Sequence, residues 1–145
     1  MEKAMLQISR GAVIAMHGCV LIGEAAGRPV PAGEIASVFG VSAAHVSKVM
    51  QRLCRAGVVR SARGPDGGFL LAAPPERITL LKAVSAVDGK IAPAKCLLGR
   101  HSCLRRRCMI GDFASRFEAE FKKVLSRTLA EAAAYSHGKK PAPRA

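Results

Sequence analysis

The feature that most constrains the fold of this chain is a glycine-rich turn between two short apolar segments. Residues 58–62 and 69–72 have the composition of β-strands, and Arg63-Gly64-Pro65-Asp66-Gly67-Gly68 forms the turn between them. Two short helices are predicted just before it, at about 31–39 and 43–56, with a tight Gly-Val-Ser turn between them. A helix–turn–helix followed by a basic-tipped hairpin predicts a winged helix. A solvated hairpin that binds nothing is the alternative.

The rest of the chain is predicted to be mainly helical. A helix at about 5–26 is apolar nearly all round and should therefore be buried. Thr79 is expected to cap a short helix that ends near Asp88. A last helix at about 110–135 carries apolar or small residues at steps of three and four: Ile110, Phe113, Phe117, Phe121, Val124, Thr128 and Ala132. This stripe needs a partner, either a second subunit or the first helix of the same chain.

The predicted organisation has four parts. Residues 1–89 form a winged helix-turn-helix domain, and 90–109 form a cysteine-bearing loop. Residues 110–136 form a long C-terminal dimerisation helix, and 137–145 form a flexible basic tail. The fold class is therefore mainly α with a small β-hairpin wing.

Charge points to a polyanionic partner. The chain has 145 residues, of which 23 are Lys or Arg and 10 are Asp or Glu, so its formal net charge is +13. Nine basic and five acidic groups give +4 in residues 1–78, and fourteen and five give +9 in residues 79–145. Such an excess favours nucleic acid or an anionic membrane as partner, while the 50% apolar content excludes global disorder.

The longest uncharged stretch, residues 11–23, is too short to cross a bilayer. This stretch resembles the apolar region of a signal peptide, but export would leave one of the five cysteines unpaired. We therefore expect a cytoplasmic protein with reduced thiols and no membrane partner.

Two runs in this chain carry a family resemblance. They are Val59-Arg60-Ser61-Ala62-Arg63-Gly64-Pro65-Asp66-Gly67-Gly68-Phe69-Leu70-Leu71-Ala72 and Pro74-Pro75-Glu76-Arg77-Ile78-Thr79-Leu80-Leu81. With the RGPxGG core and the PPExITL run at this spacing, the chain resembles the Rrf2 family of bacterial winged-helix repressors, which includes IscR-like and NsrR-like regulators. The resemblance implies binding to double-stranded DNA as a twofold homodimer. His45, with Lys48 three residues on, is more similar to the NsrR-type recognition helix.

The helix at 43–56 would then lie in the major groove, with its N-terminal half toward the base edges. Candidates for base contacts are Ser42, His45, Ser47 and Lys48, and those for phosphate contacts are Gln51 and Arg52. Wing candidates are Arg60 and Arg63 for phosphate or the minor groove, and Gly64, Gly67 and Gly68 for close backbone approach. The competing interpretation is that the cations only solvate a face and that Ser42 is only a helix cap.

Three cysteines, Cys96, Cys103 and Cys108, lie in one segment with gaps of six and four residues. Three thiolates close round an iron–sulfur cluster if a fourth ligand joins them, and the neighbouring arginines would offset the negative charge of that cluster. The resemblance places the cluster ligands of sensing members at these positions. We therefore expect an iron–sulfur cluster, either 2Fe–2S or 4Fe–4S.

The fourth ligand stays open. The His that follows the third cysteine in IscR-like members is missing, and the N-terminal Asp of NsrR-like members aligns with Arg10. His101, Asp112 or a group from the other subunit are candidates. Other interpretations are a Cys₃His zinc site, a cluster-free thiol switch, and inert thiols. Cys19 and Cys54 fall on helix faces and are expected to be small core residues.

The function predicted is a DNA-binding transcriptional regulator, expected to be a repressor. Its iron–sulfur cluster would control DNA affinity and sense nitric oxide, redox state or iron status. A regulator of the same fold that responds to thiol oxidation, zinc or a small molecule is the alternative, and a small electron-transfer or metal-carrier protein is a further one. An enzyme with a small-molecule substrate is disfavoured, because the four histidines lie in separate elements without a nucleophile motif or phosphate-binding loop.

Overall fold

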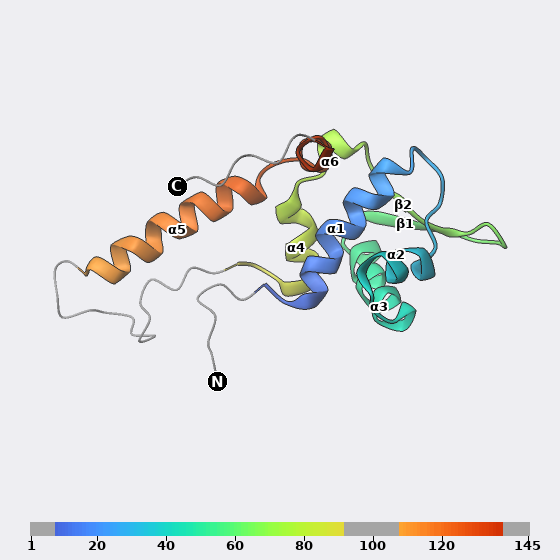
Figure 1. Cartoon of the computed structure of the whole chain (residues 1–145), viewed down its shortest axis with the longest axis horizontal. Coiled ribbons are helices and arrows are strands. Elements are labelled where there is room, and N and C mark those ends of the chain that lie inside the picture. Colours follow the sequence, from blue (N-terminus) through green and yellow to red (C-terminus); the bar gives the residue numbers. More distant parts are fainter. Residues whose placement is uncertain (1–7, 92–107, 138–145) are drawn as a thin grey trace.

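The computed structural model describes residues 8–91 and 108–137. Helices and strands follow one another along the chain as α1 (Arg10–Glu24), α2 (Ala32–Phe39), α3 (Ala43–Arg55), β1 (Val59–Ala62), β2 (Gly68–Leu71), the 3₁₀ turn η1 (Pro75–Arg77), α4 (Leu80–Asp88), α5 (Met109–Leu125) and α6 (Leu129–His137). Figure 1 shows α1 crossing the centre of the body, the β1–β2 hairpin extending from one end, and α5 projecting from the other. In the ranges described, no helix has both the length and the apolar content to traverse a bilayer.

The core is built around α1, as its all-round apolar sequence predicts. Ile14, Cys19 and Ile22 are buried, and the helix packs against α3, α4 and α6. A Cβ on Gly18 would lie 2.8 Å from Cε of Met50, so the glycine lets α3 come close to α1. Burial raises the pKa of the Cys19 thiol to about 12, which keeps it a neutral core residue, as expected.

Local sequence signals set the helix ends in the helix–turn–helix. Gly40 ends α2 in the left-handed conformation with φ of 61°, which other residues rarely adopt. The Ser42 hydroxyl then accepts a hydrogen bond from the His45 N–H at 3.2 Å and begins α3. Thr79 caps α4 in the same way through the Lys82 N–H. The sequence predicted all three of these helix-end residues correctly.

The single C-terminal helix predicted at about 110–135 is wrong in one respect, because the structure divides it into α5 and α6. A capping box makes the break: the Thr128 hydroxyl accepts from the Glu131 N–H at 3.2 Å, and the Glu131 carboxylate accepts from the Thr128 N–H at 2.7 Å. The break also pairs with the segment before α4, since Leu80 donates to the Arg127 carbonyl and Leu129 to the Ile78 carbonyl. Thr128 therefore serves as a cap and not as part of an interfacial stripe.

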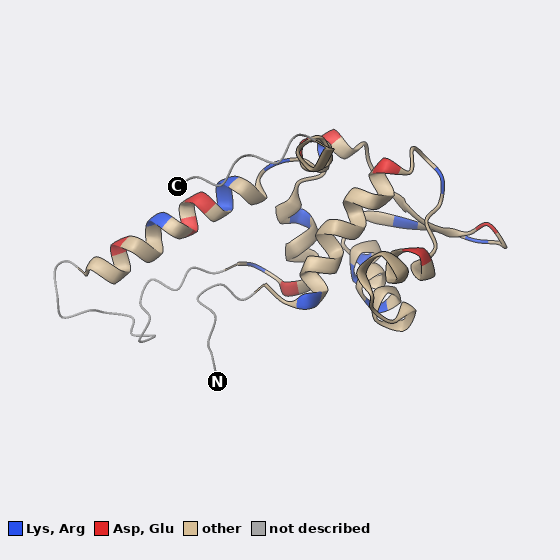
Figure 2. Ribbon diagram, in the orientation of Figure 1, with Lys and Arg blue, Asp and Glu red and all other residues tan. Residues whose placement is uncertain are grey.

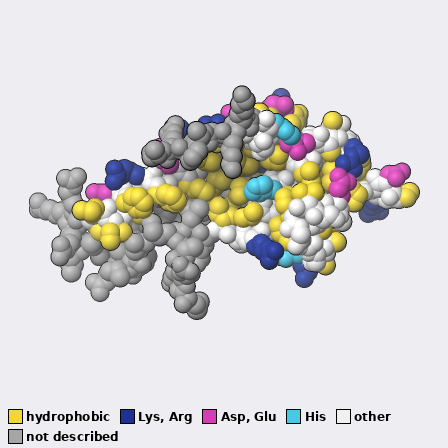
Figure 3. Space-filling model, viewed as in Figure 1, with side chains coloured by type: hydrophobic (Ala, Val, Ile, Leu, Met, Phe, Trp, Pro, Cys, Tyr) yellow, Lys and Arg dark blue, Asp and Glu magenta, His cyan; other side chains and the backbone are white. Residues whose placement is uncertain are grey.

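The apolar stripe of α5 is divided between two environments. At its C-terminal end, Leu125 is buried with Ala12 of α1 and Val84 of α4, and Phe121 packs against the same cluster. Toward the N-terminus, the side chains of Phe113 and Phe117 are exposed, and so are those of Met109 and Ile110. Figure 3 shows hydrophobic side chains running along α5 and continuing onto the body.

Candidate nucleic-acid interface

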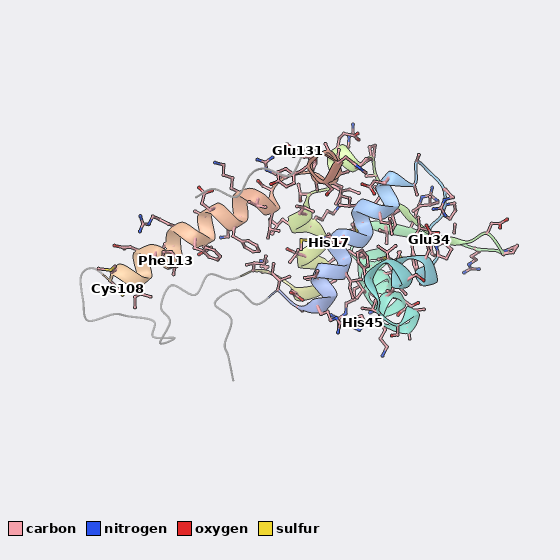
Figure 4. All side chains as sticks on the ribbon, in the orientation of Figure 1. His17, Glu34, His45, Cys108, Phe113 and Glu131 are labelled. Atoms are coloured by element: carbon pink, nitrogen blue, oxygen red, sulfur yellow. The ribbon has the colours of Figure 1, made fainter. Side chains whose placement is uncertain are left out.

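Helix α3 presents one buried and one exposed face. Val46, Val49, Met50 and Leu53 point into the core. The polar side chains that α3 leaves exposed are those of His45, Lys48, Gln51, Arg52 and Arg55, whereas Ser47 is half-buried. Figure 2 shows basic residues on α3, and Figure 4 shows His45 at the surface of this helix. The sequence-predicted recognition residues thus lie together on a solvent-facing surface.

Two of these side chains already have contacts within the protein. Ser42 is exposed, but its hydroxyl is engaged as the α3 cap, which is the structural role that the sequence left open. Arg52 was assigned to a phosphate, yet its Nη1 donates to the Val87 carbonyl of α4 at 3.1 Å. No sequence signal predicted the Arg52 contact, because it depends on how α3 packs against α4.

The wing is a two-stranded antiparallel hairpin in the register Val59–Leu71, Arg60–Leu70, Ser61–Phe69 and Ala62–Gly68. Arg60 and Arg63 are both exposed, and Asp66 is exposed on the same turn. Figure 1 shows the hairpin reaching beyond the body at the end that holds α2 and α3, away from α5. The exposed cations of the wing and of α3 therefore lie at the same end of the molecule.

Glycine is required at each of three wing positions for a different steric reason. Gly64 turns the chain with φ of 105°, a conformation that favours glycine, and nothing lies near its missing side chain. A Cβ on Gly67 would lie 2.5 Å from the Ala62 carbonyl oxygen, and one on Gly68 would lie 2.5 Å from the Val30 carbonyl carbon. Gly67 and Gly68 are thus needed to form and seat the hairpin, whereas Gly64 leaves open backbone at the tip.

The base of the wing is fixed to the α1–α2 connection. Val30 and Phe69 exchange two backbone hydrogen bonds, of 3.0 and 2.9 Å, which add a one-residue bridge to the edge of β2. In the same connection, Arg28 forms a bidentate pair with Glu34 of α2, at 3.0 and 2.8 Å. Hydrogen bonds from the Arg28 guanidinium hold the pKa of the Glu34 carboxyl below its ordinary value. These contacts orient the wing relative to the helix–turn–helix.

Of the predicted metal ligands, Cys108 and the alternative fourth ligand Asp112 lie among the described residues, while Cys96, Cys103 and His101 fall outside them. Cys108 is exposed and precedes α5, and its Sγ accepts from the Gly111 N–H at 3.4 Å. Figure 4 shows it at the end of α5 that is far from His45. Within residues 8–91 and 108–137, no three His, Cys, Asp or Glu side chains come together as a metal site.

The donor chemistry of Cys108 fits an iron–sulfur cluster, because an exposed thiol at a helix N-terminus can serve as a thiolate ligand. Cys54 differs, because it is half-buried against the core, and burial raises the pKa of its thiol. Both Cys19 and Cys54 are therefore packing residues, as the sequence predicted.

An apolar groove of about 750 Å³ lies between α1, α5 and α6. Apolar residues from all three helices line it, among them Leu21, Phe121, Val124 and Tyr135, together with His17, which Figure 4 labels on α1. Phe121 and Val124 belong to the stripe of α5, so the groove and the exposed stripe form one continuous apolar surface. Sequence periodicity found the stripe but not the groove.

Comparison with known proteins agrees with the fold. The family model described as "Rrf2: Iron-dependent Transcriptional regulator" matches residues 8–134. HTH-type transcriptional regulator IscR of Escherichia coli K12 is 36% identical over 94 residues, which are 65% of this chain and 56% of IscR. Putative regulator BadM of Rhodopseudomonas palustris is 31% identical over 83 residues, 57% of this chain and 53% of BadM. The chain thus spans about half the length of the curated relatives it matches.

Solved structures show the same architecture. CymR, the global cysteine regulator of Bacillus subtilis, superposes with a TM-score of 0.74 at 25% identity, over 90% of this chain and 98% of CymR. The IscR of T. potens superposes with a TM-score of 0.67 at 21% identity, over 97% and 93% of the two chains. The relatives are regulators and not enzymes, as the sequence predicted. With the winged-helix architecture and a family model that covers residues 8–134, this chain belongs to the Rrf2 family of transcriptional regulators.

Proposed function

We propose that this chain regulates transcription, as a repressor, by binding duplex DNA with α3 in the major groove and the wing on the flanking backbone. The observation that carries the proposal is the exposed face of α3, on which Lys48 and His45 stand opposite a fully buried apolar face. The Lys48 ammonium suits the acceptors of guanine in the major groove, and the Ser47 hydroxyl suits either donors or acceptors there.

The wing supports the same proposal. Arg60 and Arg63 are exposed on a hairpin whose base is hydrogen-bonded to the α1–α2 connection. Gly64, next to Arg63, presents backbone without a side chain at the tip. Such an arrangement suits contact with a phosphate or a narrow minor groove. Gly67 and Gly68 serve this proposal indirectly, by shaping the hairpin, and Gln51 adds a further polar side chain on α3.

Fluorescence anisotropy with labelled duplexes selected by the protein from a random pool tests the proposal. We expect Lys48→Ala to weaken binding about tenfold, the equivalent of ~1.4 kcal/mol. Lys122→Ala is the matched control, because Lys122 lies on α5 in a pair with Glu118 and should leave binding unchanged. Affinity should fall steeply between roughly 50 and 300 mM salt as counterions are released. Salt-independent binding, or equal effects of the two variants, would contradict the proposal.

The same proposal includes a homodimer formed through α5. Phe113 and Phe117 stack at 6.3 Å between ring centroids and stay exposed, on a helix that leaves the body of its own chain. An apolar face of this kind is costly in water, and a second copy of α5 offers a matching face. The groove beside Phe121 and Val124 extends the surface that such a partner would cover.

We further propose that an iron–sulfur cluster on Cys96, Cys103 and Cys108, with His101 as a candidate fourth ligand, controls DNA affinity. When bound, the cluster would supply chemistry that is sensitive to nitric oxide, oxidants and iron supply. Cys108 supports this, since its exposed thiol begins the same helix that we propose as the dimer contact. A change at Cys108 would thus act directly on the position of α5.

Anaerobic purification followed by visible spectroscopy and iron and sulfide analysis tests the cluster. We expect a coloured protein whose absorption band is lost in Cys103→Ala, whereas Cys19→Ala should keep it. A second candidate is a cluster-free thiol switch, favoured by the exposure of Cys108 to oxidants. A colourless protein whose DNA affinity changes with peroxide would favour this second candidate, and the DNA-binding proposal would stand in either case.

A further inference from the structure

Three segments of the chain meet at the last turn of α4. The Val87 carbonyl accepts a hydrogen bond from Nη1 of Arg52 on α3, at 3.1 Å. The next residue, Asp88, accepts from the backbone N–H of Ser9 at 2.8 Å and also from the Ser9 hydroxyl. Ser9 is itself the N-cap of α1. The end of α4 is therefore attached to the recognition helix on one side and to the start of α1 on the other.

The contact with Arg52 has a clear physical basis. The last carbonyls of a helix have no partner within the helix, and the C-terminus carries a partial negative charge that favours a cation. A guanidinium satisfies both needs, because it brings a positive charge and several N–H donors on a long stem. Among the described residues, the side chains of Lys48 and Arg55 on the same helix form no hydrogen bond, so Arg52 alone joins α3 to α4 in this way.

The position of this junction in the chain gives it a regulatory meaning. α4 ends at Asp88, only eight positions before Cys96, the first of the three clustered cysteines. The Val87 carbonyl that Arg52 holds and the Asp88 carboxylate that Ser9 holds therefore lie close in sequence to that segment. A missing side chain at Gly11 lets this turn lie close to α1, since a Cβ there would be 3.1 Å from Cγ1 of Val87. The last turn of α4 is therefore packed closely against the first turn of α1.

We propose that Arg52 is a positioning residue that links the last turn of α4 to the orientation of α3, and that it is not a phosphate contact. This rests on the proposed function in one respect, namely that α3 binds DNA. Through this link, a displacement of the end of α4 changes the orientation of α3, and DNA binding in turn stabilises the end of α4, because coupling between two sites is reciprocal.

The test compares Arg52→Met, which keeps most of the stem but removes the donors, with Arg55→Met, which makes the same charge change on the same helix. Hydrogen exchange of the full-length protein reports the Gly89 amide, which donates to the Ser85 carbonyl at the end of α4. Without DNA, we expect exchange there to rise about fivefold or more in Arg52→Met and to be unchanged in Arg55→Met. Arg52→Lys, which retains a donor, should restore part of the protection.

The same exchange measurement is repeated with a bound random-sequence duplex of about 30 base pairs. Wild-type protein and Arg55→Met should gain protection at the end of α4 when the duplex binds, and Arg52→Met should not. The salt dependence of binding should keep the wild-type slope in Arg52→Met, whereas loss of a phosphate contact would lower the slope by about one. Either a lower slope or unchanged exchange at Gly89 overturns the proposal.

The two proposals fail in different ways. If the wild-type chain binds no duplex, the DNA-binding function is wrong, and the exchange experiment without DNA still decides whether Arg52 holds the end of α4. If the duplex binds but the Gly89 amide exchanges alike in all variants, the link through Arg52 is wrong while the DNA-binding function stands.

Discussion

Helices α1 and α5 both carry apolar residues at helical spacing, but they meet different surroundings. Ile14 and Ile22 of α1 are 3% and 2% exposed, on a helix that packs against α3, α4 and α6. Ile110 and Phe113 of α5 are 55% and 51% exposed, because they lie at the N-terminal end of the helix, which projects from the body. An apolar stripe thus predicts that a helix has a partner, but it does not say whether the same chain provides it.

The largest loss of stability is expected from a substitution in the core that is built around α1. Leu53 of α3 is completely buried, so Leu53→Ala removes apolar contacts and leaves a cavity. We expect the free energy of unfolding to fall by about 2–5 kcal/mol, as measured by urea denaturation at fixed protein concentration. Val38→Ala, at a side chain that is 58% exposed, should change it by less than ~0.5 kcal/mol. Equal effects of the two substitutions would mean that this core does not support the fold.

A substitution in the exposed stripe of α5 should impair self-association but not folding. Phe117→Glu places a charge in the exposed stripe, and we expect it to weaken self-association at least about 100-fold, or ~2.7 kcal/mol, while the winged-helix body stays folded. Sedimentation equilibrium measures the association, and far-UV circular dichroism measures the helix content. Ala119→Glu, on the other face of α5, is the control and should leave the association unchanged. A wild-type chain that is monomeric at high concentration would refute the dimer.

In the wing, the addition of a single Cβ atom should cause a smaller loss of stability. In Gly68→Ala the new Cβ would meet the Val30 carbonyl, so the bridge between Val30 and Phe69 must open or shift. We expect a loss of about 1–3 kcal/mol in unfolding free energy and weaker DNA binding. Gly33→Ala has open space around it in α2 and should be neutral or stabilising by up to ~1 kcal/mol. Normal DNA binding by Gly68→Ala would show that the seat of the wing is unimportant.

Sequence reasoning succeeded where the deciding signal is local. Gly40 and Ser42 define the turn of the helix–turn–helix through their own backbone and side chain, and Gly64 does the same for the wing. The exposed face of α3 followed from the spacing of its apolar residues. These elements need no knowledge of what packs against them, so the fold and the exposed side chains of α3 could be predicted from the sequence, whereas their contact with DNA stays a prediction.

Sequence reasoning failed where contacts join distant segments. The bond from Arg52 to the Val87 carbonyl spans 35 positions, and that from Ser9 to Asp88 spans 79, so no periodicity predicts them. The break between α5 and α6 was a different failure, since the Thr128 and Glu131 spacing is a capping box that the apolar stripe concealed. The steric role of Gly67 and Gly68 also depends on the backbone that they approach, which the sequence alone does not show.

The break between α5 and α6 also sets the direction in which α5 leaves the body, and its capping box gives the smallest predicted effect. The Thr128 N–H, which donates to the Glu131 carboxylate, lowers the pKa of that carboxyl in the folded protein. A lowered folded-state pKa adds stability above the unfolded-state pKa, and this stability is lost as the pH falls through the folded-state value. Glu131→Gln should therefore destabilise the protein slightly at neutral pH.

The size of that destabilisation should shrink in acid, where the wild-type carboxyl is also protonated. Urea midpoints of the two proteins, compared at neutral pH and again well below the ordinary pKa of a carboxyl, measure the change, with Glu120→Gln on the exposed surface of α5 as control. A difference that stays constant over this range would show that the Glu131 charge is not what holds the cap. The direction of α5 would then depend on the backbone pairing of residues 127–129 with residues 78–80 alone.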